Sequence, residues 1–161
     1  MRLSGYSGAG NLPLHIAERQ KKSVSEKIYS EAAGLPSVDM KIIETPTPGQ
    51  GTFVFLKAES ENSVSGFTSI GERGKRAEAV GEEAAADFLR YYLSNAAFDS
   101  HLPNQIVLYL SMCKRESVFS TSCITQHLMT NLWVIGLFQK YIYSVEGDLG
   151  KAGMIKINGG Q

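Results

Sequence analysis

Residues 52–93 decide the fold and read TFVFLKAESENSVSGFTSIGERGKRAEAVGEEAAADFLRYYL. The run at 52–58 is rich in residues that favour strands, and a second such run follows at 64–70 after a short polar loop. From Ala77 to about Leu93, apolar residues recur at helical spacing, which predicts a helix with one face on a sheet. Two strands followed by a helix indicate a small sandwich of a sheet and helices.

The residues before this stretch add one helix and one strand. The segment from about Leu14 to Ala33 predicts a helix with an apolar stripe, followed by glycine and proline. The segment 38–44 alternates apolar and polar residues and predicts a strand. The glycine-rich start, MRLSGYSGAGNLP, predicts a loop that leads into the first helix. Residues 1–96 are therefore expected to form two helices over three or four strands.

Residues 97–161 predict a second unit in the order α-β-α-β-β. Its first helix is expected to contain Gln105 to Cys113, with Pro103 in the first turn and Asp99 or Ser100 as the cap. The helix has a nearly continuous apolar run and is therefore expected to be buried on most sides.

The rest of this unit begins with a short strand at 118–122. A helix capped by Ser122 or Thr125 should then run to about Phe138. Two strands joined through residues 147–150 predict a hairpin at the end of the chain. This order lacks an opening strand, which is expected to come from sequence that precedes the chain.

The composition is that of a chain with a real hydrophobic core. Of its 161 residues, 43% are hydrophobic and 20% charged, and 16 basic residues balance 16 acidic ones. This balance does not indicate a broad cationic surface for nucleic acid, so any RNA would be bound locally. Cys113 and Cys123 form no metal motif and are expected to be buried free thiols. With no signal peptide and no long apolar run, we expect a soluble, cytoplasmic protein.

The segment STSCITQHLMTN, residues 120–131, is the best candidate for chemistry. His127 is expected in the first turn of its helix, one position off the apolar stripe. The start of a helix favours anions and disfavours imidazolium, so the ring should stay neutral and nucleophilic. Asn131, one turn later, could orient the ring or contact a ligand. By spacing alone, a surface or capping role for His127 is the alternative.

Two weaker candidates lie elsewhere. His101, Leu102, Pro103, Asn104 and Gln105 form a loop-to-helix junction that could hold a nucleotide base or phosphate, with an ordinary capped helix as the alternative. The loop Gly71–Lys75 loosely resembles a phosphate-binding loop but lacks the full spacing, which favours a solvated turn.

Four blocks of this sequence resemble the RNA 3'-terminal phosphate cyclase family, in that family's order and spacing. The blocks are SGAGNLPLHIAERQ, GFTSIGERGKRAEAVGEEAA, DSHLPNQIVLYL and FSTSCITQHLMTNLWV, and together they span most of residues 4–138. Members of the family are about twice as long, so the chain resembles their C-terminal half.

The resemblance implies an α+β fold in two parts. Residues 1–96 are similar to a small thioredoxin-like α/β insert domain. Residues 97–161 are similar to the end of the last β-α-β-α-β-β repeat of the cyclase large domain, here the C-terminal part of the catalytic domain. The missing opening strand would then lie before the insert.

The resemblance also implies a ligase that acts on RNA 3'-phosphate ends. Such enzymes use ATP and a divalent metal, Mg²⁺ or Mn²⁺, to make 2',3'-cyclic phosphates through a covalent histidine–AMP intermediate. The histidine of that intermediate matches His127, and the nucleotide-contacting segment matches His101, Leu102, Pro103, Asn104 and Gln105. The missing N-terminal half of the cyclase is an expected partner, and we expect little or no activity from these residues alone.

Two positions depart from the family pattern. The family usually reads His/Tyr-Leu-Ala-Asp-Gln, where this chain has Pro103 and Asn104 and so lacks the carboxylate. Two alternatives therefore stay open beside the enzyme: a non-catalytic cyclase-like protein that acts in ribosome biogenesis or rRNA processing, and a degenerate fragment without activity. The non-catalytic branch does not keep the nucleophilic histidine, and the presence of His127 favours the enzyme.

Overall fold

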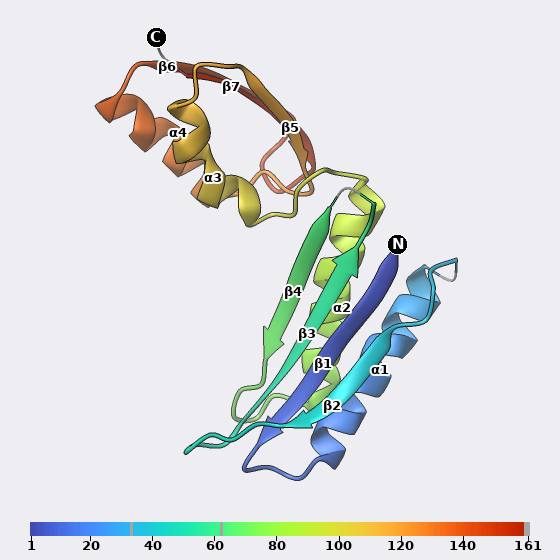
Figure 1. Ribbon diagram of the computed structural model, residues 1–161. Helices are drawn as coiled ribbons and strands as arrows, with labels where there is room; N and C mark the ends of the chain where they lie inside the picture. Colours follow the sequence, from blue (N-terminus) through green and yellow to red (C-terminus); the bar gives the residue numbers. More distant parts are fainter. Residues whose placement is uncertain (33, 62, 160–161) are drawn as a thin grey trace. The chain divides into compact units, whose positions relative to one another are not determined.

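The computed structural model describes residues 1–32, 34–61 and 63–159 (Figure 1). They form two compact units, 1–90 and 91–161. The elements that begin in the first unit are β1 (Arg2–Gly10), α1 (His15–Glu31), β2 (Asp39–Glu44), β3 (Gly51–Glu59), β4 (Val64–Ile70) and α2 (Ala77–Ser94). Those of the second unit are α3 (Leu102–Ser111), β5 (Ser117–Thr121), α4 (Gln126–Phe138), β6 (Tyr141–Glu146) and β7 (Gly153–Gly159).

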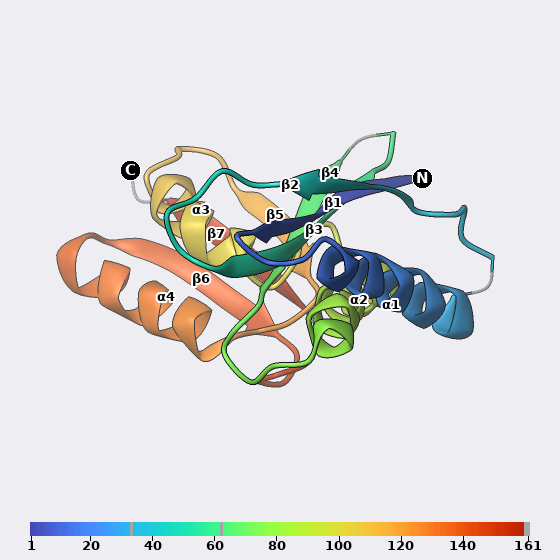
Figure 2. The same ribbon diagram turned by 90° about the horizontal axis from the view of Figure 1, so that it is seen from below.

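The sheet of the first unit has the strand order β2-β1-β3-β4. Strand β1 is parallel to β2 and antiparallel to β3, and β4 is antiparallel to β3. Both helices lie on one face of this sheet (Figure 2). The Ser23 hydroxyl of α1 donates to the carbonyl of Glu78 in α2 at 2.9 Å, so the helices are in direct contact. The predicted pair of helices over a sheet is confirmed, while the predicted helix end at Ala33 lies outside the described residues.

The glycine-rich start of the chain was predicted wrongly as a loop, because it forms the strand β1 inside the sheet. The reason lies in β3. A Cβ atom on Gly5 would come 2.2 Å from the carbonyl oxygen of Phe55, and one on Gly8 would come 2.3 Å from the ring of Phe53. These glycines permit a close approach of two strands and do not mark a turn.

The core of the first unit lies between the sheet and the two helices. The rings of Phe67 and Phe88 meet edge to face, with centroids 5.7 Å apart. A polar cluster is enclosed in the same core. The Ser7 hydroxyl lies 2.9 Å from Oε1 of Gln20, whose Nε2 donates to Oγ1 of Thr52 at 2.7 Å. Because these groups bond to one another, their burial is not heavily penalised.

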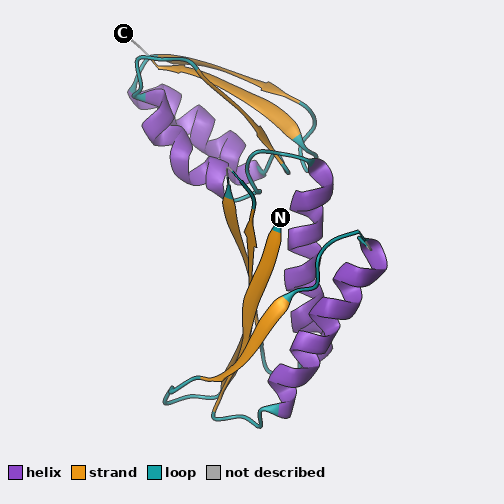
Figure 3. Cartoon of the chain, turned by 45° about the vertical axis from the view of Figure 1, so that its right-hand side comes forward, coloured by secondary structure: helices purple, strands orange, loops and turns teal. Residues whose placement is uncertain are grey.

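The second unit packs α3 and α4 against one face of a three-stranded sheet (Figure 3). The strand order is β5-β7-β6, and both pairings are antiparallel. The predicted order α-β-α-β-β and the hairpin of β6 and β7 are confirmed. The buried core consists of Val107, Phe119, Ile124, Leu128, Leu132, Ile135, Ile155 and Ile157.

The prediction that the first helix of this unit is buried on most sides was wrong. In α3, Val107 is fully buried, whereas Leu108 is 49% and Tyr109 68% exposed. Only one side of the helix packs on α4 and β7, so a continuous apolar run does not give all-round burial here. The α+β class predicted from the sequence is confirmed, and the thioredoxin-like assignment of residues 1–96 stays a prediction.

Candidate active site

The start of α4 is built by a threonine cap. Thr125 has an extended backbone, and its Oγ1 accepts a hydrogen bond from the amide of Leu128 at 3.1 Å. Of the two predicted caps, Thr125 is the one observed. The stripe that holds the helix in the core is also confirmed, since Ile124, Leu128 and Leu132 are at most 1% exposed. These buried residues of one apolar stripe fix the direction in which the first turn points.

His127 is the second residue of α4, and its side chain is exposed. The first amides of a helix lack acceptors within the helix, and the peptide dipoles give that end a partial positive charge. An imidazole in this turn is open to solvent and adjoins backbone that favours phosphate. The predicted position off the apolar stripe is confirmed.

The second predicted segment begins α3. Oδ1 of Asp99 accepts hydrogen bonds from the amides of His101 and Leu102, both at 2.7 Å. The N-cap residue of α3 is His101, and its side chain makes no capping hydrogen bond, so the prediction of Asp99 or Ser100 as the cap was wrong. Asp99 instead holds the two amides where the helix begins. Pro103 is buried in the first turn, whereas His101 and Gln105 are exposed. The exposed members of this segment are thus available to a ligand, and the proline is part of the packing.

A pair of asparagines joins the two predicted segments. Nδ2 of Asn131 donates to Oδ1 of Asn104 at 2.5 Å and is 3.2 Å from its carbonyl oxygen. Both residues are half-buried. Asn131 was expected to serve the imidazole or a ligand, but its amide hydrogens are used by Asn104. Sequence spacing gave no signal for this contact, because the partners lie 27 positions apart on different helices.

The glycine-flanked loop at 71–75 is held by contacts within the first unit. Nζ of Lys75 pairs with the carboxylate of Glu83, which also accepts a hydrogen bond from Ser69 at 2.8 Å. Lys75, and after it Ser69, hold the pKa of the Glu83 carboxyl below its usual range. Lys75 thus already has an acidic partner, in agreement with the solvated turn.

In the described part of the chain, the cysteines and acidic residues are not grouped as a metal site requires. Over residues 1–32, 34–61 and 63–159, no group of three or more His, Cys, Asp or Glu side chains is placed to hold a metal ion. Cys113 and Cys123 are free, but Cys113 is exposed and Cys123 half-buried, so the expectation of buried thiols was wrong. None of the helices in the described part of the chain has the length and apolar character needed to cross a lipid bilayer.

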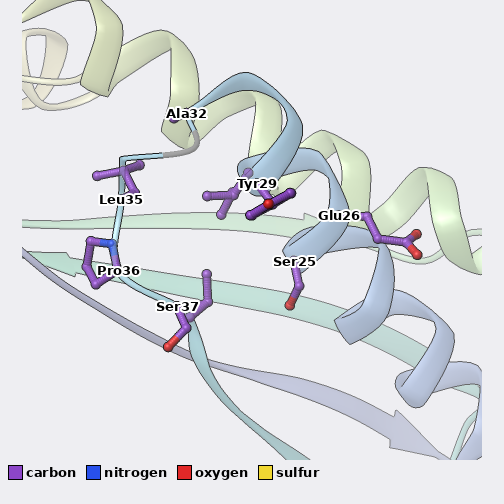
Figure 4. A pocket seen from close by; sticks show the side chains of 9 residues that line it. Ser25, Glu26, Tyr29, Ala32, Leu35, Pro36 and Ser37 are labelled. Atoms are coloured by element: carbon purple, nitrogen blue, oxygen red, sulfur yellow. The ribbon is translucent and has the colours of Figure 1, made fainter.

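An apolar hollow of about 510 Å³ lies in the first unit, between the end of α1 and the segment that follows it (Figure 4). Ile28, Tyr29, Leu35, Pro36 and Val38 supply most of its lining. The hollow contains none of the predicted site residues and has no charged group other than Glu26 at its margin. It is therefore separate from the candidate chemistry at α3 and α4.

An exposed histidine on the capped start of α4, joined by an asparagine pair to the start of α3, is suited to handle phosphate groups. Comparison with known protein families shows to which family this phosphate-handling chain belongs. The family model of the RNA 3'-terminal phosphate cyclase insert domain matches residues 1–93. The chain belongs to the RNA 3'-terminal phosphate cyclase family.

Similar proteins bear the same family name. An RNA 3'-terminal phosphate cyclase of Methylococcus capsulatus is 36% identical over 157 residues, covering 98% of this chain and 43% of that protein. Proteins of that name from Thermococcus onnurineus and Pyrococcus furiosus are 38% and 34% identical, each over 44% of their length. The chain thus spans less than half the length of these curated relatives and matches their C-terminal part.

Proposed function

We propose that this chain forms the C-terminal part of an ATP-dependent RNA 3'-terminal phosphate cyclase, a ligase that converts RNA 3'-phosphate ends to 2',3'-cyclic phosphates. Residues 1–96 are proposed as its insert domain and 97–161 as part of its catalytic domain. The observation that carries the proposal is the exposed His127 on the first turn of α4, in a chain of this family.

In the proposed reaction, His127 is the nucleophile. A neutral imidazole nitrogen attacks the α-phosphorus of ATP, a P–N bond forms, and the bond to the β-phosphate oxygen breaks so that pyrophosphate leaves. An oxygen of the RNA 3'-phosphate then displaces the imidazole from AMP. Finally the ribose 2'-hydroxyl attacks the 3'-phosphorus, loses its proton to solvent and expels AMP. The partial positive charge of the α4 start would stabilise the phosphoryl charge during the first two steps.

The start of α3 is proposed to contact the nucleotide. His101 and Gln105 are exposed there, and Asn104 is held by Asn131 from the helix that carries His127. This bond would fix the spacing between the nucleotide contacts and the nucleophile. Because the described residues lack a set of metal-binding side chains, the proposal assigns none of them to the divalent metal ion.

The remaining part of a full-length cyclase is proposed as a partner. On the second unit, Trp133, Leu137 and Phe138 of α4 are exposed, with Phe138 at 86%. Ile142 of β6 is exposed as well. Large apolar groups that gather on one small unit are commonly covered by another protein surface. The relatives are more than twice as long as this chain and have the additional sequence to supply such a surface.

The experiment is covalent labelling with ATP that carries ³²P at the α-phosphate. A full-length protein is assembled from the N-terminal part of the Methylococcus capsulatus relative and this chain. We expect label that is stable in alkali and labile in acid, as a phosphoramidate of imidazole is. His127→Ala and His127→Asn should abolish it, and His15→Ala, which alters an exposed histidine of the first unit, should keep it.

The outcomes separate the two candidate functions. Undiminished labelling of the His127→Ala protein would falsify the assignment and return this residue to a surface role. If the unaltered protein is folded but accepts no label and forms no cyclic phosphate, the non-catalytic role in rRNA processing takes precedence.

A further inference from the structure

The sheet of the first unit has one face that its own helices do not cover (Figure 2). Along β3, Thr52, Val54, Leu56 and Ala58 are buried toward the helices, and the residues between them alternate to the other face. Phe53 and Phe55 thus project on the open face, where both are half-buried. Tyr6 of β1 is directly opposite Phe55 and is 42% exposed.

The strand register gathers these three aromatic side chains in the middle of the sheet. Gly8 is the partner of Phe53, and the ring of Phe53 covers the place that a Cβ atom of Gly8 would occupy. In the same way, a Cβ atom on Gly66 of β4 would lie 3.0 Å from the ring of Phe55. Each ring therefore rests on the backbone of a neighbouring strand and has its outer side toward solvent.

A cation completes the same row of the sheet. Lys41 of β2 is the partner of Tyr6, so Lys41, Tyr6 and Phe55 follow one another across three strands. Lys41 is exposed and has no acidic partner among the residues that the structure describes. Lys57, on the same face, is paired with Glu59 at 2.6 Å. Lys41 is therefore a cation available to a phosphate group beside the rings.

We propose that this face, consisting of Tyr6, Phe53, Phe55 and Lys41, binds single-stranded RNA by base stacking. The proposal rests on RNA being the substrate class, as in the proposed function. Nucleotide bases stack on aromatic rings irrespective of their sequence, and an open four-stranded sheet is a known platform for this. The balanced net charge of the chain fits a local site of this kind better than a broad electrostatic one.

The test is fluorescence anisotropy of the whole chain with a labelled single-stranded RNA of ten nucleotides, without ATP. Phe55→Leu keeps apolar bulk on the face and removes the ring, and we expect about tenfold weaker binding. Phe55→Tyr should restore the affinity of the unaltered chain. Lys41→Ala should weaken binding and reduce its dependence on salt concentration. A double-stranded RNA of the same length should compete poorly, because its bases are already stacked.

Two control variants show whether RNA binding is confined to this sheet face. Tyr29→Ala removes an exposed aromatic ring on α1, away from the open sheet face, and should bind as the unaltered chain does. His15→Ala, at an exposed histidine of α1, should also leave RNA affinity unchanged. Covalent labelling tests the cyclase assignment and anisotropy without ATP tests the sheet site, so failure of one and failure of the other give different results. Circular dichroism melting curves of each variant verify that the fold persists.

The proposal is overturned if the folded Phe55→Leu chain binds RNA as well as the unaltered chain. It is also overturned if the unaltered chain self-associates without RNA and Phe55→Leu abolishes this association. That result would assign the face to a second copy of the chain.

Discussion

At the scale of single residues, Asn104 occupies a position that a carboxylate could also satisfy. Its Oδ1 accepts the hydrogen bond from Asn131, and an aspartate oxygen would accept the same bond. The residue is the third of α3, where the helix start favours negative charge. Compared with an aspartate at this position, Asn104 keeps the hydrogen bond between α3 and α4 and lacks only the negative charge.

We expect Asn104→Asp to raise the rate of His127 adenylylation in a full-length protein without altering its thermal stability by more than a few degrees. The added carboxylate would help to hold a metal–nucleotide complex at the α3 start. Single-turnover labelling with ATP measures the rate. Asn158→Asp, which makes the same replacement at an exposed position of β7 outside this segment, serves as the matched control. An unchanged or reduced rate would show that the amide already suffices or that the segment does not contact the nucleotide.

Tyr141 offers a second prediction at this scale. Its hydroxyl donates to the carbonyl of Leu132, and burial, followed by the nearby Tyr143, raises the pKa of Tyr141 to about 12. The pKa is higher in the folded than in the unfolded state, so the protonated Tyr141 hydroxyl contributes to stability. This contribution is complete below about pH 10 and is lost as the pH rises toward 12. Tyr141→Phe should cost about 1 kcal/mol of unfolding free energy at pH 8. It should also make stability less sensitive to pH above 10. Urea unfolding at pH 8 and above pH 10 measures both effects, and Tyr109→Phe, which alters an exposed ring of α3, serves as the control.

At the scale of elements, the ion pair of Arg19 and Glu78 ties α1 to α2. Nε and Nη2 of Arg19 donate to the two carboxylate oxygens at 2.8 and 2.9 Å. The hydrogen bonds from Arg19 are the main cause that lowers the pKa of the Glu78 carboxyl from 4.5 to about 2. The two-bond geometry distinguishes this ion pair from ordinary surface pairs, which contribute little.

The sign of the pH effect follows from the lowered pKa. The contribution of Glu78 is present above pH 4.5 and is lost as the pH falls toward 2. We expect the urea midpoint of the unaltered chain to fall more steeply between pH 5 and pH 3 than that of Glu78→Gln. Glu72→Gln, at an exposed loop position, should behave as the unaltered chain does. Equal slopes in all three proteins would contradict a role for the ion pair.

Elements with strong periodicity could be predicted from the sequence, and those shaped by contacts between elements could not. The stripe of α4 was predicted correctly and Thr125 was one of its two predicted caps, because helical spacing and a capping side chain are local signals. Strand β1 was missed because its glycines are required by contacts with β3. Gly5 lies against the backbone of β3 and Gly8 against the ring of Phe53, and their neighbours in sequence give no sign of these contacts. The bond between Asn104 and Asn131 depends on the packing of α3 on α4, which no local pattern encodes.

At the scale of the whole molecule, the two units differ in how much apolar surface they leave exposed. The first unit has its helices packed on one sheet face and a buried, fully bonded polar cluster in the core. In the second unit, the exposed large apolar side chains include Tyr109 of α3, Met112 just after that helix, and Trp133 and Phe138 of α4. Opening such a unit exposes less additional apolar surface to water. The free energy of its opening should therefore be lower than that of the first unit.

We therefore expect limited proteolysis of the chain with proteinase K to leave a resistant fragment of about the first 90 residues and to degrade the second unit. Mass spectrometry of the fragments over time measures this, and hydrogen exchange should show faster exchange in α3 and α4 than in α1 and α2. In a full-length protein completed by the N-terminal part of a relative, both helices of the second unit should become protected, because the exposed rings would then be covered. The first unit should change little. Equal protection of both units in the chain alone would argue for a single cooperative domain. If the second unit stayed labile in the full-length protein, the proposed partner surface would be wrong.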